Sequence, residues 1–369
     1  MIIRVALGLM VLVGVVARAA DTVETLAIGA AAPDFNLPGV DGKDHALKDF
    51  AQAKLLLIVF TTNHCPTAQA YDQRLIDLHK DYAPKGVAVV AISPNDPLAV
   101  RLDELGYTDV TDDLESMKIR AKDRNFAFPY LYDGKTQSVS KAYGCQATPH
   151  VFLFDAERKL RYTGRIDDEQ VKPPTKHDLR NALDALLAGK PVPVEKTKVF
   201  GCSTKWASKR EEAAKSLAKW DAEPVELTEI DLAGIKALAK NDGQKLRVIN
   251  VWATWCAPCT AELPELVAMN RMYRKRPFEM VTISLDDPEK KQLAHDKLKE
   301  LKVATTNYLY KGDRDAMMTA LDAKWEGPVP HTLIVAPGGK VIYRHTGQFD
   351  PLEVKRAIVG HLGRTYADK

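Results

Sequence analysis

Two cysteines separated by Ala257 and Pro258 give the strongest chemical signal in the sequence. The motif WCAPC runs from Trp255 to Cys259 and follows the apolar, β-branched segment LRVINVW. A cysteine that opens a helix after a buried strand meets unpaired backbone N–H groups and the positive end of the helix dipole, which favour its thiolate. We therefore predict that Cys256 attacks a substrate disulfide and that Cys259 resolves the resulting mixed disulfide.

Glu262 and Pro330 fit the same chemistry. Glu262 lies one helical turn beyond Cys259, where a partly buried carboxylate can exchange protons with the thiols. The alternative is a solvent-facing acid that complements the helix dipole. Pro330, in GPVPHTL, begins a predicted strand, and a cis peptide bond there would expose the backbone of Val329 to a substrate strand. We also expect Trp255 to contact the substrate.

The WCAPC motif needs no cofactor beyond its own redox-active disulfide. Zinc would require further thiolates or histidines at ligand spacing, and the sequence has no second C-x-x-C. We therefore expect neither a metal nor an organic cofactor. A purely structural disulfide is a weaker interpretation, because such a short loop is a poor staple.

The first half of the chain carries an incomplete version of the motif. In FTTNHCPTAQAY, Cys65 follows an apolar run, but Ala68 stands where a second cysteine would complete C-x-x-C. His64 and the start of a predicted helix both favour a Cys65 thiolate. Four interpretations stay open: exchange through a single thiol, an inert core residue, peroxide reduction, and a soft-metal site for copper with His64 and His150.

The two cysteine motifs lie in two copies of one predicted architecture. LLLIVFTTNHCPTAQAYDQRLIDL resembles LRVINVWATWCAPCTAELPELVAM, and each reads as a buried strand, a turn with cysteine and an amphipathic helix. ATPHVFLFDAERKLRYTGRID likewise matches PVPHTLIVAPGGKVIYRHTGQFD. Pro149 thereby takes the place of Pro330, and we expect it to line a substrate-binding site. The order β-α-β-α-β-β-α predicts two three-layer α/β/α sandwiches in tandem, each around a mixed sheet.

The predicted domains are residues 28–188 and 223–369. The segment 189–222 begins with alternating prolines and becomes highly charged, which is typical of a linker, and KWASKREEAAKSLAKW within it predicts a helix. The net charge is only +3 and the Lys-rich stretches are of mixed sign, so nothing indicates nucleic-acid binding.

The N-terminus has the form of a secretory signal peptide, residues 1–19. MIIR supplies a positive start, VALGLMVLVGVV an apolar core, and Ala17-Arg18-Ala19 a cleavage site. The apolar core is too short to span a bilayer, which takes about 20 residues, so no transmembrane segment is expected after its removal. Export to an extracytoplasmic space would let disulfides form and persist.

Residues 223–362 resemble the ResA/TlpA-type thioredoxin-like thiol–disulfide oxidoreductases, an exported bacterial family. VWATWCAPCTAELPEL follows that family's W-C-x-P-C-x-x-E-x-P pattern, with Glu262 and Pro264 in place, and GPVPHT supplies its cis-proline. The resemblance implies a thioredoxin-like fold and a periplasmic reductase of protein disulfides. It also implies a membrane-embedded thiol electron donor that recharges the reductase.

Residues 28–206 resemble the redoxin/AhpC-TSA superfamily, and within it an uncharacterised peroxiredoxin-like branch with an N-H-C-P motif. The stretches that carry this resemblance are IGAAAPDFNLPGVDGKDHALKDF, FTTNHCPTAQAY, GVAVVAISPND and TPHVFLFDAERKLRYTGRIDD. The resemblance implies a second thioredoxin-like fold and brings with it the label of antioxidant activity.

The peroxiredoxin pattern P-x-x-x-T-x-x-C is only partly met in this half. Thr62 is in place, but Ile58 occupies the proline position. Cys65 follows Phe60 by five residues, whereas the two cysteines of WCAPC follow Trp252 by four and seven. Cys65 therefore aligns with the first cysteine of C-x-x-C, whereas a peroxidatic cysteine aligns with the second.

Cys145 and Cys202 are the remaining cysteines. If Cys65 forms mixed disulfides, one of these two or the WCAPC pair must resolve them, since Ala68 cannot. Cys202, in FGCSTKW, matches the tail motif of the resembled branch, whereas that branch carries its other cysteine where this chain has Ala147. Our hypothesis is a disulfide between Cys145 and Cys202 that ties the linker to the first domain.

Taken together, the sequence predicts an exported thiol–disulfide oxidoreductase that reduces or exchanges protein disulfides through Cys256 and Cys259. The alternative is an antioxidant thiol peroxidase in which Cys65 is peroxidatic and the Cys256–Cys259 pair regenerates it. A third, non-enzymatic interpretation is a copper- or partner-binding module.

Overall fold

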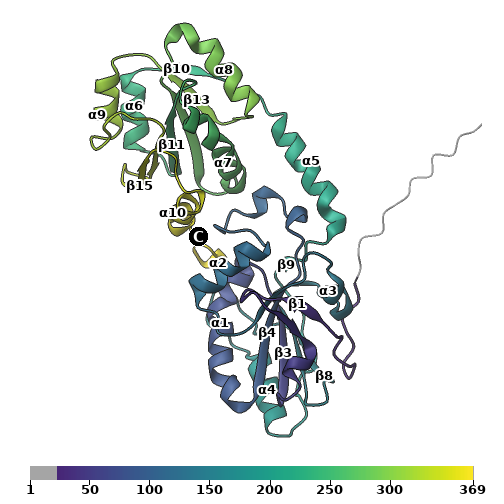
Figure 1. Cartoon of the computed structure of the whole chain (residues 1–369). Coiled ribbons are helices and arrows are strands. Elements are labelled where there is room, and N and C mark those ends of the chain that lie inside the picture. Colours follow the sequence, from purple (N-terminus) through teal and green to yellow (C-terminus); the bar gives the residue numbers. More distant parts are fainter. Residues whose placement is uncertain (1–22, 369) are drawn as a thin grey trace, which may run out of the picture.

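The computed structural model describes residues 23–368, which form two α/β units, each built on its own sheet (Figure 1). We call residues 23–206 the N-terminal unit and residues 223–368 the C-terminal unit. The predicted signal peptide lies outside the described residues. Within residues 23–368, no helix combines the length and the apolar character needed to cross a bilayer.

A five-stranded mixed sheet with the order β5-β4-β3-β7-β8 forms the centre of the N-terminal unit. β3, β4 and β5 are parallel, and β7 pairs antiparallel with β3 and with β8. All six side chains of β3 are buried, because both faces of the sheet are covered. One face packs against α1, α2 and α4. The other packs against α3 and the segment with Phe35 and Leu37.

The elements of the N-terminal unit have the following bounds: β1 (Asn36–Pro38), β2 (Asp44–Ala46), β3 (Leu55–Phe60), α1 (Pro66–Tyr82), β4 (Val87–Ser93), α2 (Leu114–Arg124), β5 (Tyr130–Tyr132), α3 (Ser138–Tyr143), β6 (Ala147–Thr148), β7 (His150–Phe154), β8 (Leu160–Gly164), α4 (Asp178–Leu187) and β9 (Cys202–Ser203).

The C-terminal unit repeats this plan on a six-stranded sheet with the order β10-β13-β12-β11-β14-β15. β11 pairs parallel with β12 and antiparallel with β14, as β3 does with β4 and β7. Its elements are β10 (Thr228–Ile230), α6 (Leu232–Lys240), β11 (Leu246–Trp252), α7 (Ala257–Tyr273), β12 (Phe278–Ser284), α8 (Lys291–Glu300), β13 (Thr306–Tyr310), α9 (Arg314–Leu321), β14 (His331–Val335), β15 (Val341–Thr346) and α10 (Pro351–Leu362). The predicted fold class, two thioredoxin-like α/β folds in tandem, is confirmed.

The segment predicted as a linker divides into two parts. Residues 195–206 pack against the rest of the N-terminal unit. The Thr163 N–H donates to the carbonyl oxygen of Glu195, the Thr197 N–H donates to the carbonyl oxygen of Thr163, and β9 pairs antiparallel with β6. The predicted helix is present as α5 (Arg210–Asp221), which has no buried residue and spans the space between the two units (Figure 1). Only the second part bridges the units.

The two units contact each other through the loop that follows β4. Leu105 in this loop is buried in the hydrophobic core of the C-terminal unit. The carbonyl oxygen of Thr108 accepts a hydrogen bond from Tyr273 Oη at 2.9 Å. Asp109 forms a two-pronged ion pair with Arg364, at 2.6 and 2.8 Å. Apolar, neutral polar and ionic contacts therefore all join the units.

Candidate functional site

Cys256 lies at the N-terminal end of α7, directly after the turn that follows β11. It is the N-cap residue, and its Sγ accepts a hydrogen bond from the Cys259 N–H at 3.3 Å. The two cysteines form a disulfide, with Cα atoms 5.3 Å apart. Cys256 keeps 6% of its surface exposed and Cys259 none, so an incoming thiol reaches Cys256 first.

A cis peptide bond joins Val329 and Pro330, as the sequence predicted. The carbonyl oxygen of Val329 lies 3.5 Å from Cys256 Sγ. Trp255, next to Cys256 in the chain, is 58% exposed, which is unusual for so large an apolar side chain. The structure thus brings together all the residues predicted for attack and substrate contact around WCAPC.

Glu262 is buried, so the solvent-facing alternative for this residue is wrong. Its Oε1 accepts a hydrogen bond from Asn250 Nδ2 at 2.8 Å, and its Oε2 one from the Phe349 N–H at 3.4 Å. Burial raises the pKa of Glu262 to about 7, against the opposing effect of these two hydrogen bonds. A carboxyl group with such a pKa can both hold and release a proton near neutral pH.

Two residues that support this site were not predicted from the sequence. Asn250 orients Glu262 through a hydrogen bond. In the sequence, Asn250 could have been noticed as the single polar residue within the buried run VINVW. Asp286 accepts hydrogen bonds from the Thr254 N–H at 3.0 Å and from Thr254 Oγ1 at 2.5 Å. These bonds fix the turn that presents Cys256.

Cys65 repeats the geometry of Cys256 in the N-terminal unit. It is the N-cap residue of α1, and its Sγ accepts a hydrogen bond from the Ala68 N–H at 3.4 Å. The same sulfur lies 3.4 Å from the carbonyl oxygen of Thr148, which precedes the cis peptide bond to Pro149. Cys65 therefore corresponds to the first cysteine of C-x-x-C, as the spacing predicted.

A buried ion pair lies beside Cys65. His64 Nδ1 is 2.5 Å from Asp112 Oδ2, and both side chains are inaccessible to solvent. Asp112 also accepts hydrogen bonds from Asn95 Nδ2 at 2.8 Å and from the backbone N–H groups of Asn63 and His64 at 2.9 and 3.1 Å. Desolvation alone would lower the pKa of His64, but the charge of Asp112 outweighs it and raises the pKa. Asp112 therefore favours the protonated form of the imidazole next to Cys65.

The surroundings of Cys65 favour its thiolate. Burial by itself would raise the pKa of Cys65, but hydrogen bonds from Cys202, the charge of His64 and the Ala68 N–H together hold it below the ordinary value of a thiol. The hydrogen bond that Cys202 donates to Cys65, together with burial, raises the pKa of Cys202. Asp112 lies 47 residues from Cys65 in the sequence, and no local pattern singles it out.

The predicted disulfide between Cys145 and Cys202 is not formed, since both are free thiols. Cys145 Sγ lies in the core, 3.4 Å from the carbonyl oxygen of Ala147 and 3.5 Å from Thr204 Oγ1. The register of β9 on β6 pairs Cys202 with Thr148 instead. This pairing brings Cys202 to Cys65 and leaves Cys145 as a buried thiol whose pKa is raised by burial to about 12.

His150 is engaged away from the cysteine. Its Nδ1 accepts a hydrogen bond from the Gln146 N–H at 3.3 Å, and its Nε2 lies 3.1 Å from Thr163 Oγ1. Burial lowers its pKa to about 3. His64, Cys65 and His150 are therefore not arranged as a ligand set, and among residues 23–368 no group of three or more His, Cys, Asp or Glu side chains is arranged to hold a metal ion.

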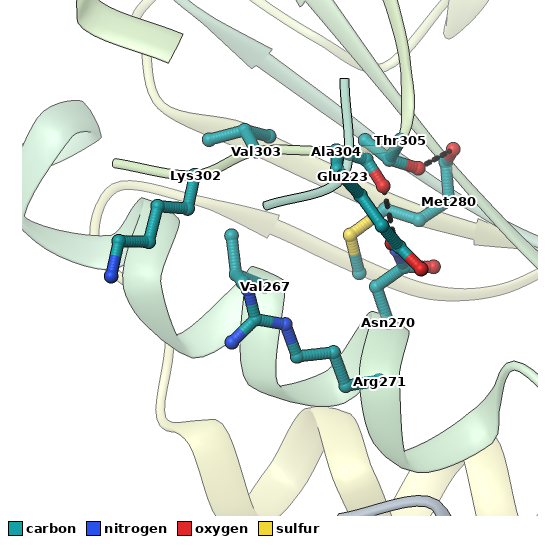
Figure 2. A pocket seen from close by; sticks show the side chains of 9 residues that line it. All are labelled: Glu223, Val267, Asn270, Arg271, Met280, Lys302, Val303, Ala304 and Thr305. Atoms are coloured by element: carbon teal, nitrogen blue, oxygen red, sulfur yellow. Dashed lines mark hydrogen bonds between the residues drawn. The ribbon is translucent and has the colours of Figure 1, made fainter. Parts of the chain in front are cut away.

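A small pocket lies at the other end of α7 (Figure 2). Arg271, on its wall, is 15 residues beyond Cys256, or about 22 Å along the helix axis. Arg271 and Lys302 both form ion pairs with Asp221 at the end of α5. The pocket thus belongs to the joint between α5 and the C-terminal unit.

Two thioredoxin-like units, each with a cysteine at a helix N-terminus beside a cis-proline, define a tandem protein of the redoxin and thioredoxin class. The family described as AhpC/TSA matches residues 28–163 and 218–344. These two segments make up well over half of the chain, so the chain belongs to this family.

Curated relatives and solved structures are similar in sequence to parts of this chain. A thiol-disulfide oxidoreductase ResA of Geobacillus thermodenitrificans is 26% identical over 149 residues, which are 40% of this chain and 75% of that protein. A protein of the same name from Bacillus subtilis is 31% identical over 99 residues, 27% of this chain and 51% of that protein. The chain thus spans between half and three quarters of the length of these two relatives.

Among solved structures, a hypothetical protein from Sinorhizobium meliloti is 38% identical, with a TM-score of 0.45, and covers 50% of this chain and 97% of its own. An uncharacterized conserved protein from Geobacillus kaustophilus is 39% identical, with a TM-score of 0.44, and covers 49% of this chain and 92% of its own. The curated relatives support the predicted class, a thioredoxin-like oxidoreductase.

Proposed function

We propose that the protein is a thiol–disulfide oxidoreductase that reduces or exchanges disulfides of other proteins through Cys256 and Cys259. The observation that carries this proposal is the placement of Cys256. Its sulfur belongs to the more accessible cysteine of a disulfide, at a helix N-terminus and 3.5 Å from the carbonyl oxygen of Val329 before a cis-proline.

The reduced pair acts in two steps. The Cys256 thiolate attacks a substrate disulfide while the substrate backbone lies along Val329 and its side chains contact Trp255. Cys259 then attacks the mixed disulfide and releases the reduced substrate. Cys259 is fully buried, so it needs a nearby base before it can attack.

Glu262 is the base proposed for Cys259. Positions 259 and 262 lie three residues apart on α7 and therefore on the same side of the helix. With a pKa of about 7, Glu262 can accept the thiol proton when Cys259 attacks and return it when the pair is reduced again.

The cellular setting is part of the same proposal. We propose domains at 28–188 and 223–369, export by the segment 1–19, and an extracytoplasmic location such as the bacterial periplasm. The apolar run Val5–Val16 and the small residues after it support export. A membrane-embedded thiol donor would then recharge the oxidised pair.

Trapping of substrates tests the proposal directly. A Cys259→Ser variant retains the nucleophile but cannot resolve the mixed disulfide, so it should accumulate covalent complexes with reducible protein substrates. These are detected as dithiothreitol-sensitive bands on non-reducing gels. A Cys256→Ser, Cys259→Ser double variant is the matched control. Equal bands in both variants, or none with Cys259→Ser, would contradict the assignment.

A further inference from the structure

We propose that Cys65 and Cys202 form a second redox-active pair, a reversible disulfide in which strand β9 supplies the cysteine that position 68 lacks. The placement of β9 carries the inference. β9 pairs antiparallel with β6, with Cys202 opposite Thr148 and Ser203 opposite Ala147. Because Cys65 Sγ contacts the carbonyl oxygen of Thr148, both cysteines adjoin the same residue. Each of the two thiols also shifts the pKa of the other, which is consistent with sulfurs that lie close together.

Strand β9 takes the position that a substrate strand would take. In the C-terminal unit, the backbone before the cis-proline is the proposed docking edge for a client. In the N-terminal unit, the equivalent edge at Thr148 is covered by the chain itself. Cys202 thus stands where the cysteine of a docked client would stand, facing the nucleophile at the helix N-terminus.

Close backbone packing and a hydrogen bond hold the segment around Cys202 in place. Gly201 adopts φ of 140°, and a Cβ at this position would lie 2.1 Å from the carbonyl oxygen of Thr148. A residue with a side chain would push β9 away from β6. On the other side, the Lys205 N–H donates to Asn95 Oδ1 at 2.8 Å, and Asn95 also holds Asp112. The segment from Gly201 to Lys205 and the His64–Asp112 pair therefore share one hydrogen-bond network.

The exposure of the two sulfurs fixes the order of the reaction. Cys65 is fully buried, whereas Cys202 is partly exposed. A thiolate of a client dithiol protein therefore attacks Cys202 Sγ of the oxidised pair. The Cys65–Cys202 bond breaks, and Cys65 leaves as a thiolate beside His64 and the Ala68 N–H.

The second half of the reaction releases the client. Its other thiol attacks the client sulfur of the mixed disulfide, Cys202 leaves, and Cys202 takes up a proton. The client loses two electrons and gains a disulfide, and the Cys65–Cys202 pair gains these two electrons. A protein or small-molecule disulfide reoxidises the pair by the reverse steps.

Redox titration of the full chain tests this proposal. The Cys256→Ser, Cys259→Ser variant, which lacks the other pair, is equilibrated in buffers of reduced and oxidised glutathione, quenched with acid, alkylated after unfolding and mapped by mass spectrometry. We expect a peptide linked through Cys65 and Cys202 that rises from under one tenth to over nine tenths of the protein, and falls again on return to reducing buffer. Free Cys65 and Cys202 in every buffer, or a link from Cys202 to Cys145, would overturn the proposal.

Three further measurements keep the titration interpretable. Adding Cys145→Ser, a change at an equally buried thiol, should leave the titration unchanged. Adding Cys202→Ser should abolish the linked peptide in every buffer, with unfolding monitored by circular dichroism to confirm a folded chain. If hydrogen peroxide forms the bond and oxidised glutathione does not, exchange at this pair is refuted in favour of peroxide reduction. The function proposed for the C-terminal pair is untouched by any of these outcomes.

Discussion

In the N-terminal unit, β9 lies against the backbone that precedes the cis-proline, whereas within residues 23–368 no strand pairs with the equivalent Val329 of the C-terminal unit. Both cysteines cap a helix of the same length and accept a hydrogen bond from the N–H three residues on. The neighbours differ: a buried His64 in one unit and an exposed Trp255 in the other. One backbone arrangement therefore supports a closed site and an open one.

The groups that handle protons differ in the same way. The C-terminal site has Glu262, a buried carboxyl group held by Asn250. The N-terminal site has the His64–Asp112 ion pair. A buried carboxyl group with a pKa of about 7 is suited to proton transfer during repeated exchange, whereas an ion pair that favours a protonated imidazole stabilises the neighbouring thiolate. The helix N-terminus thus sets the position of the sulfur, and the residues around the sulfur determine its chemistry.

The largest expected effect separates the two sites. Cys256→Ser should lower the reduction of insulin disulfides by dithiothreitol-recharged protein by about 100-fold or more, because a hydroxyl group replaces the attacking thiolate. Cys65→Ser should leave that rate within about twofold, because Cys65 is fully buried beneath β9. Turbidity of precipitating insulin measures both rates. Equal losses in the two variants would show that the sites act as one.

Stability should report the ionisation of Glu262. Its pKa of about 7 in the folded chain exceeds the ordinary 4.5, so the carboxyl group favours folding at acidic pH and that advantage is lost as the pH rises from about 4.5 to about 7. Glu262→Gln, which has no charge to bury, should therefore gain stability relative to the native chain across this window, by roughly 1 to 3 kcal/mol. Urea unfolding of the C-terminal unit at pH 4.5 and pH 8 measures the difference. A difference that does not change with pH would contradict the raised pKa.

Asp112→Asn should raise the pKa of Cys65. The amide keeps an oxygen for the backbone N–H groups but removes the charge that raises the pKa of His64. We expect the midpoint of thiolate absorbance at 240 nm to move up by about one pH unit. The Cys256→Ser, Cys259→Ser background leaves Cys65 as the ionising thiol at low pH. Asp286→Asn, at the C-terminal turn, is the matched control and should not move this midpoint.

The smallest effect should come from Trp255→Ala. Since the ring is mostly exposed, its removal should leave the melting temperature unchanged within about 1 °C. The lost contact with protein substrates should raise KM by about threefold to tenfold at constant kcat. A fall in kcat alone would place Trp255 in the chemistry of the pair rather than in docking.

The sequence predicts those parts of the molecule that repeat or that follow local rules. The strand–cysteine–helix order, the hairpin after each Pro-His pair and the cis bond before Pro330 were all accessible from spacing and residue type. Residues contributed from far away were not. Asp112 reaches His64 across 48 residues, and Cys202 reaches Thr148 across 54, through pairings that no local pattern encodes.

The hypothesis for Cys145 failed for a related reason. Cys145 and Cys202 are both near Thr148, and from the sequence either one can be imagined beside the other. The register of β9 decides between them, because it places Cys202 opposite Thr148, whose carbonyl oxygen lies 3.4 Å from Cys65 Sγ. Cys202 faces Cys65, and it is Thr204, not Cys202, that contacts Cys145.

The burial of Leu105 in the opposite unit bears on how the protein behaves as a whole. The loop that carries Leu105 packs into the core of the C-terminal unit, and its Asp109 forms an ion pair with Arg364. The two units are therefore held together independently of the bridging helix α5. A chain nicked by a protease within the exposed α5 should therefore elute as one particle in gel filtration, and separate into two fragments only when denatured.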